Sequence, residues 1–112
     1  MQDLFAERKA IIEELTKETE VMRNSGCQYA HNKRDYRKAV RVETLREIME
    51  GTKVTVISDL VRGISHVADL QDARDCSEAM YKSSQEKINV LKLRLRIVED
   101  DINREWNSGD RR

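Results

Sequence analysis

The side chains best suited to metal binding or nucleophilic catalysis are few. The chain has two histidines, His31 and His66, and two cysteines, Cys27 and Cys76. Cys27 and His31 are spaced i, i+4, as two ligands on one side of a helix would be, but neither histidine has the further cysteine, histidine and carboxylate neighbours that a metal site needs. No nucleophile elbow, glycine-rich phosphate loop or HExxH motif is present. We therefore expect a protein that is not an enzyme and uses no metal or cofactor.

The two cysteines lie 49 positions apart, each within a helical pattern. No CxxC pair or apolar secretion signal accompanies them. We expect two reduced, buried or half-buried thiols in the cytoplasm of a cell, with a disulfide or a reactive thiol as the alternatives. No run of 18 apolar residues exists, so the sequence predicts no membrane span and no membrane partner.

A basic cluster between positions 33 and 41 is the strongest local charge feature. The members that share one helix face are Arg34, Arg37, Lys38 and Arg41. Such a face can contact phosphates, so it is a candidate site for an anionic partner, either a protein, a nucleotide or a nucleic acid. The alternative is a solvated face whose charges pair with nearby carboxylates, namely those of Asp35, Glu43 and Glu47.

The last long segment, from Ile64 to Trp106, carries two apolar stripes. The first consists of Ile88, Leu91, Leu95, Val98, Ile102 and Trp106, and the second of Val90, Leu93 and Ile97. The two stripes fall about half a turn apart at ~100° per residue, so a helix here must bury two opposite sides. We assign Val90, Leu93, Ile97 and Trp106 to an interface with a second copy of the chain.

Composition supports a helical protein. Charged and apolar residues each make up 38% of the 112 residues, aromatic residues only 4%, and proline is absent. This balance is typical of long helices with many surface ion pairs. Basic and acidic residues number 21 each, so no net charge attracts nucleic acid or lipid. A chain this short buries only about two-thirds of its unfolded surface as a monomer, which also favours self-association.

We expect one domain, residues 1–112, with four parts. An N-terminal helical arm covers 3–50, a tip with a short helix 51–63, a long C-terminal helix 64–106 and a frayed tail 107–112. The weak helix formers Asn24, Ser25 and Gly26 predict either a turn or a kink in the first arm.

Capping residues define the tip. Gly51 fits the C′ position of the first arm and Gly63 the end of the short helix. Thr55 is suited to cap the short helix and Ser65 to cap the long one. The β-branched run 53–57 is read as helix because Ile57, Leu60 and Val61 share one helical face.

The arms have matching lengths of about 64 and 70 Å at 1.5 Å per residue. We therefore predict an all-α, elongated antiparallel helical hairpin with a short tip helix, packed as a homo-oligomeric helical bundle. The alternative folds sharply at Gly26 into three helices and leaves half of the last helix projecting, which also requires a partner.

Two stretches carry a resemblance to known proteins. VTVISDLVRG (Val54 to Gly63) and YKSSQEKINVLKLRLRIVEDDINREW (Tyr81 to Trp106) resemble segments of small, coiled-coil-like helical proteins of bacteriophages and prophages of Gram-positive bacteria. The resemblance covers about the last half of the chain. It implies an accessory protein that acts by binding inside a bacterial host cell.

We therefore expect a non-enzymatic phage accessory protein that binds itself, as a homodimer or larger assembly, and a host protein, inhibiting a host defence system. Two alternatives stay open. One is a nucleic-acid-binding protein of phage replication or recombination that uses the basic cluster. The other is a protein that sequesters a nucleotide between arginines.

Overall fold

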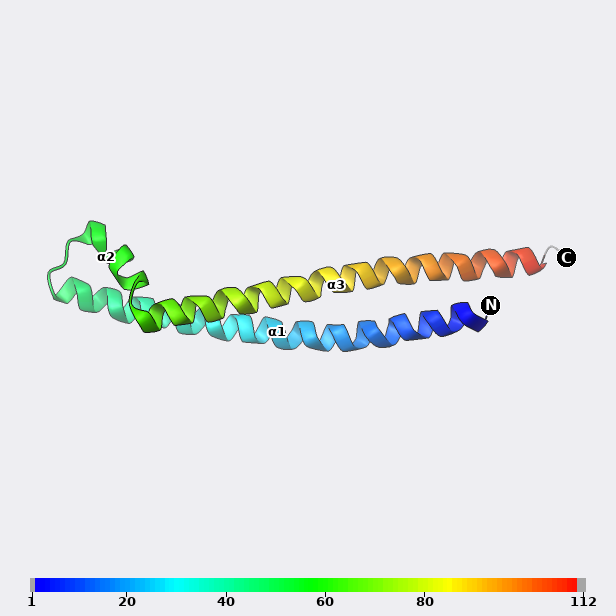
Figure 1. Ribbon diagram of the computed structural model, residues 1–112, viewed down its shortest axis with the longest axis horizontal. Helices are drawn as coiled ribbons and strands as arrows, with labels where there is room; N and C mark the ends of the chain where they lie inside the picture. The colour runs from blue at the N-terminus through cyan, green and yellow to red at the C-terminus, as the bar shows by residue number, and fades with distance from the viewer. Residues whose placement is uncertain (1, 111–112) are drawn as a thin grey trace. The chain divides into compact units, whose positions relative to one another are not determined.

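The computed structural model describes residues 2–110 of the chain, and the side chains of residues 2–108. These residues form three helices, α1 (Gln2–Met49), α2 (Val54–Arg62) and α3 (Ser65–Asp110), which Figure 1 shows. None of residues 2–110 belongs to a β-strand. The prediction of an all-α protein is therefore confirmed, with α2 inside the predicted tip.

Contacts divide the chain into two compact units. The first unit holds α1 up to Arg23 together with α3 from Lys82 onward, and the second is Asn24–Tyr81, which includes α2. Each unit has an apolar cluster of its own. The long helices α1 and α3 each contribute to both units.

The first unit is built on the first apolar stripe of α3. Its buried cluster consists of Ile11, Leu91, Val98 and Ile102, with Leu4, Leu15 and Leu95 packed against it. The spacings of three and four place the α3 members on one side of that helix, as predicted. At the edge of this cluster, Lys87 Nζ lies 3.3 Å from the Glu18 carboxylate, so the nearly buried carboxylate has a cationic partner.

In the second unit α1 and α3 run antiparallel, because residues later in α1 contact residues earlier in α3. Gly26 faces Tyr81, and Asn32 Nδ2 donates to Ser77 Oγ at 3.1 Å. Farther along, Glu43 lies 3.4 Å from His66. The apolar cluster of this unit is Ile57, Val61 and Val67, with Tyr36, Ala39, Val40 and Ile64 packed against it. α2 is therefore fixed by the two side chains that it buries in this cluster.

Helix α1 continues through Asn24, Ser25 and Gly26, so the structure has no turn at these residues. The three-helix alternative that folds at Gly26 is not the arrangement found. A Cβ atom at Gly26 would lie 3.0 Å from Cε2 of Tyr81, whose ring occupies the space a side chain would need. The glycine therefore provides room for the ring of Tyr81, not a reversal of the chain.

Gly51 ends α1 as predicted. It has φ +80°, and its N–H donates to the carbonyl of Ile48 while the N–H of Thr52 donates to that of Glu47, both at 3.1 Å. This pair of bonds is the Schellman motif, which satisfies carbonyls that the helix end would leave without donors. The Thr52 hydroxyl also donates to the Glu47 carboxylate at 2.7 Å. The direction in which the chain leaves α1 is thus set by local hydrogen bonds.

The predicted caps of the next two helices are wrong. Lys53, not Thr55, precedes α2, and no side-chain hydrogen bond caps this helix. Ser65 is the first residue of α3, and the Ile64 carbonyl accepts the first helical bond, from Ala68 at 2.9 Å. Packing of Ile57 and other buried side chains, worth more than one cap, determines where these helices begin. Gly63 follows the end of α2 as predicted.

Helix α3 extends to Asp110, four residues past the predicted end at Trp106. Asn107, Ser108 and Gly109 each cost only up to about 1 kcal/mol in a helix, so the helix can continue through them. Residues 111–112 of the predicted frayed tail 107–112 lie outside the described part of the chain.

The contact between Gly26 and Tyr81 predicts that the effect of Gly26→Ala depends on the ring. In a Tyr81→Ala background the alanine should raise the free energy of unfolding by about 1 kcal/mol, because alanine favours helix over glycine. In the native background the gain should be lost to the collision with the ring. Urea unfolding of the four chains measures the difference. An equal effect of Gly26→Ala in both backgrounds would contradict the assigned role of the glycine.

Candidate functional site

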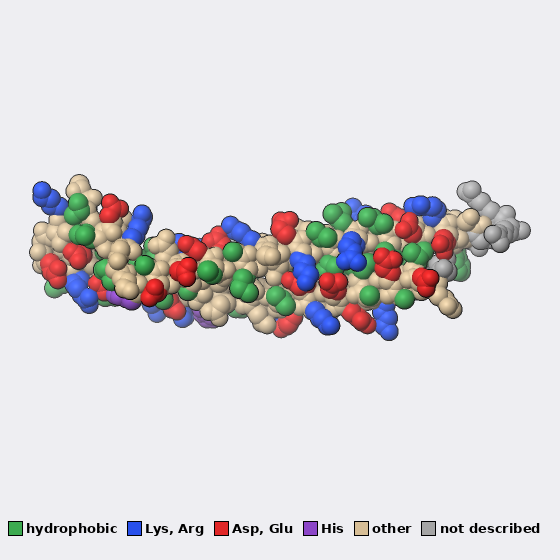
Figure 2. Space-filling view, viewed as in Figure 1, with side chains coloured by type: hydrophobic (Ala, Val, Ile, Leu, Met, Phe, Trp, Pro, Cys, Tyr) green, Lys and Arg blue, Asp and Glu red, His purple; other side chains and the backbone are tan. Residues whose placement is uncertain are grey.

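The second apolar stripe of α3 lies exposed in the first unit. The exposed fractions of its side chains are 53% for Val90, 56% for Leu93 and 60% for Ile97. Leu91, two residues before Leu93, is only 2% exposed, since α1 covers the opposite side of the helix. We call Val90, Leu93 and Ile97 the outer stripe. Figure 2 shows apolar side chains at the surface of the molecule among charged ones.

Charged residues border the outer stripe. Arg94 and Arg96 are exposed and form no ion pair with any described residue. Farther along α3, Arg104 contacts Asp101 at 3.1 Å. An apolar strip with unpaired guanidinium groups beside it has the composition of a protein interface, in which arginine is enriched and apolar side chains occupy the centre.

Trp106 does not join the outer stripe. It follows Ile97 by nine residues, which places it about half a turn away at ~100° per residue. It therefore continues the buried side of α3, one turn beyond Ile102. Its side chain is 62% exposed, because the apolar cluster that α1 contributes to reaches only as far as Ile102. The structure thus brings three of the four predicted interface residues together and leaves Trp106 on a different face.

Three exposed apolar residues of α1 in the first unit were missed by the sequence analysis, namely Phe5, Ile12 and Val21. Phe5 and Ile12 lie in the first unit, seven positions apart, and both are exposed. Each directly follows a residue of the buried side, Leu4 or Ile11, so each is rotated by ~100° from it. The signal was therefore present as two adjacent apolar pairs. The guanidinium of Arg8 lies 5.1 Å from the Phe5 ring centroid.

The basic cluster remains largely unpaired. Arg34 contacts Asp35 at 3.3 Å, whereas Arg37, Lys38 and Arg41 are exposed and have no ion-pair partner among the described residues. Two of the carboxylates considered as partners are engaged elsewhere. Glu43, only 5% exposed, contacts Arg46 and His66, and Glu47 accepts the Thr52 hydroxyl. We call Arg37, Lys38 and Arg41 the basic face.

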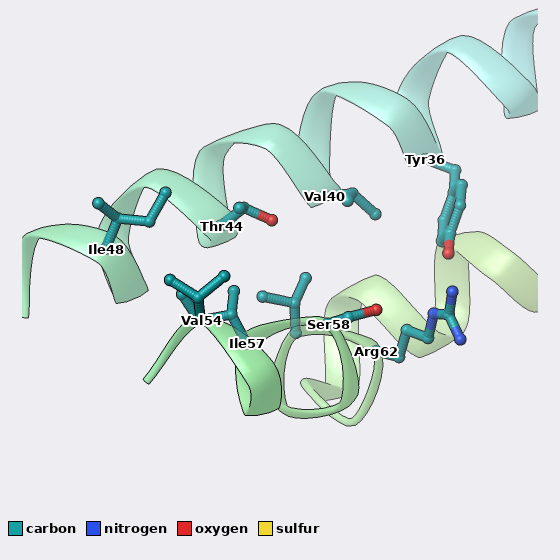
Figure 3. Close-up of a pocket in the computed structure, with 9 residues that line it drawn as sticks. Tyr36, Val40, Thr44, Ile48, Val54, Ile57, Ser58 and Arg62 are labelled. Atoms are coloured by element: carbon teal, nitrogen blue, oxygen red, sulfur yellow. The ribbon is translucent and has the colours of Figure 1, made fainter. Parts of the chain in front are cut away.

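A groove lies between α1 and α2 in the second unit, with a volume of about 320 Å³ (Figure 3). Its walls are mostly aliphatic, from Val40 and Ile48 on α1 and from Val54, Ile57 and Val61 on α2. Its polar lining comes from Tyr36, Thr44, Ser58 and Arg62. The sequence analysis missed this groove, because the patterns of α1 and α2 give no measure of the space between them.

The cysteines lie at the surface of the structure. Cys27 and Cys76 are both free thiols, but both are exposed, so the prediction of burial is wrong. Among the side chains of residues 2–108, no three histidine, cysteine or carboxylate groups gather closely enough to hold a metal ion. Within the same range no helix combines the length and apolar character needed to cross a membrane.

Besides Arg62, a second cation, Arg74, lies beside Tyr36, which lines the groove. The Arg74 guanidinium lies 4.4 Å from the Tyr36 ring centroid and donates hydrogen bonds to Asp75 at 2.9 and 3.0 Å. The hydrogen bond to Asp75 raises the pKa of Arg74 above its ordinary value. Arg74 therefore stays charged and fixes the tyrosine ring by a cation–π contact.

Comparisons of the chain with protein families, with curated proteins and with solved structures find no match. The structure itself provides three candidate surfaces: the outer stripe, the basic face and the groove.

Proposed function

We propose that this protein is a non-enzymatic binding protein that associates with a second copy of itself through the outer stripe. The observation that carries the proposal is the exposure of Val90, Leu93 and Ile97 on the side of α3 opposite its buried stripe. Contiguous exposed apolar side chains are costly in water and mark interaction sites. A helix that is apolar on two sides is typical of a bundle with neighbours on both.

The outer stripe needs additional contact area. A stable interface buries about 800 Å² on each partner, more than three half-exposed side chains provide. Phe5 and Ile12 offer further apolar area in the same unit. Arg94 and Arg96 lie beside the stripe, where their charged ends can stay at the rim while their alkyl stems add to the contact.

We further propose a role as a phage accessory protein that binds a host protein and inhibits a host defence system. The support is the resemblance of residues 54–63 and 81–106 to small helical phage and prophage proteins. Binding, rather than catalysis, also fits surfaces made of aliphatic and arginine side chains.

Leu93→Glu tests the proposed self-association. The side chain is 56% exposed, so the substitution should leave the helical circular dichroism of the chain unchanged. It should raise the dissociation constant of the oligomer at least ~100-fold, because an interface would have to bury a charged carboxylate in place of an apolar side chain. Sedimentation equilibrium at several concentrations measures this change.

The matched control is Leu60→Glu, which alters a leucine of α2 that is exposed to a similar degree, 49%. It should leave the oligomer intact. Equal dissociation by both variants, or by neither, would show that the outer stripe is not the interface.

The basic face supports a second candidate function, binding of nucleic acid. The observation in its favour is that Arg37, Lys38 and Arg41 have no carboxylate partner among the described residues. Unpaired guanidinium and ammonium groups on one helix face can displace counterions from a phosphate backbone.

Reversal of two charges tests this candidate. Arg37→Glu with Arg41→Glu should abolish a salt-sensitive mobility shift of single-stranded or duplex DNA, because two cationic contacts to phosphate are replaced by repelling carboxylates. Lys9→Glu with Lys17→Glu, which reverses two exposed charges of α1 in the other unit, should leave the shift in place. An equal loss in both double variants would indicate an effect of net charge alone, and no loss in either would exclude the basic face.

A further inference from the structure

The groove between α1 and α2 has one polar end and one apolar end. Figure 3 shows the hydroxyls of Tyr36 and Ser58 and the guanidinium of Arg62 gathered at one end, at the right of the view. Ile48 and Val54 lie toward the other end. Between the two ends the lining is aliphatic apart from the hydroxyl of Thr44. A ligand that fills this groove must therefore be polar at one end and apolar along its length.

The polar end carries hydrogen-bonding groups that have no partner within the described chain and are open to solvent. Among the described residues, no carboxylate pairs with Arg62, and the hydroxyls of Tyr36 and Ser58 have no hydrogen-bond partner. Asp59, three residues before Arg62 on α2, is exposed and does not pair with it. Two hydroxyl donors and a free guanidinium match the two oxygens of a carboxylate, which arginine binds in a bidentate manner.

The apolar end is open as well. Ile48 is 54% exposed and Val54 83% exposed, although both line the groove. Apolar side chains that face each other across a groove gain most when an apolar group fills the space between them. A ligand with an alkyl chain would cover them.

Size limits the ligand to a small molecule. The volume of about 320 Å³ lies at the lower end of the range for small-molecule sites. From Val54 to Arg62, α2 rises about 12 Å at 1.5 Å per residue, which is close to the length of an extended ten-carbon chain. The groove thus has room for one alkyl chain and its head group.

We propose that this groove binds an aliphatic monocarboxylate of medium chain length. Its carboxylate lies against Arg62, Tyr36 and Ser58, and its alkyl chain runs between α1 and α2 toward Ile48 and Val54. The inference is independent of the proposed self-association, which uses residues of the other unit.

Titration of the full chain with decanoate, below the concentration at which decanoate forms micelles, tests the proposal. Isothermal calorimetry should give saturable binding of one decanoate per chain, and methyl signals of Ile57 and Val61 should shift in nuclear magnetic resonance spectra. Decylammonium, which has the same chain but the opposite charge, should not saturate the site. Each methylene removed from the acid should weaken binding roughly fourfold.

Two variants locate the head group and the chain. Arg62→Gln should weaken decanoate binding at least ~10-fold by removing the charge-assisted contact, whereas Lys92→Gln, an exposed lysine of the other unit, should not. Ile48→Ser should weaken decanoate more than hexanoate, since only the longer chain reaches it. Circular dichroism verifies that each variant is folded.

Three outcomes would overturn the proposal. The first is no saturable binding of decanoate, and the second is equal binding of decylammonium, which would mean that the groove is merely apolar. The third is unchanged affinity in a folded Arg62→Gln variant.

Discussion

One antiparallel neighbour can cover only one side of a helix, and this limit governs the first unit. Helix α3 has apolar side chains on two opposite sides there, and α1 buries one of them around Leu91 and Val98. The outer stripe therefore stays in contact with water within a single chain. The proposed assembly follows from this arrangement, because no second segment of the described chain is available to that side of α3 in the unit.

In the second unit α1 packs against α3 through different kinds of contact. Small groups and polar contacts join α1 to α3 there, as in the approach of Tyr81 to Gly26 and the bonds from Asn32 to Ser77 and Ala73. The buried carboxylate of Glu43 is retained between Arg46 and His66, where a lone buried charge would be strongly destabilising. Such contacts bury polar and small groups. Two of the three residues in the buried apolar cluster of this unit, Ile57 and Val61, come from α2. The groove lies along α2 beside these buried residues, and at one end Val54 stays exposed near Ile48.

Periodicity predicted the three helices and the buried side of α3, since spacings of three and four residues fix which side chains share a face. It also predicted α2, although its β-branched residues favour a strand in isolation. Periodicity could not explain Gly26, because the ring that requires it belongs to a residue distant in sequence. Nor could it assign the partners of Glu43, which contacts His66 of another helix in addition to the nearby Arg46. The groove depends on such long-range packing, which spacing along one helix does not determine, whereas the shared face of Arg37, Lys38 and Arg41 follows from spacing alone.

Light scattering coupled to size-exclusion chromatography, performed on the native chain across a wide concentration range, tests self-association most directly. Association through the outer stripe should give a mass of at least twice the 13.1 kDa of one chain. The absorbance ratio at 260 and 280 nm should be typical of protein alone. A mass of 13.1 kDa at every concentration would contradict this association, since the outer stripe would then remain exposed in the native protein.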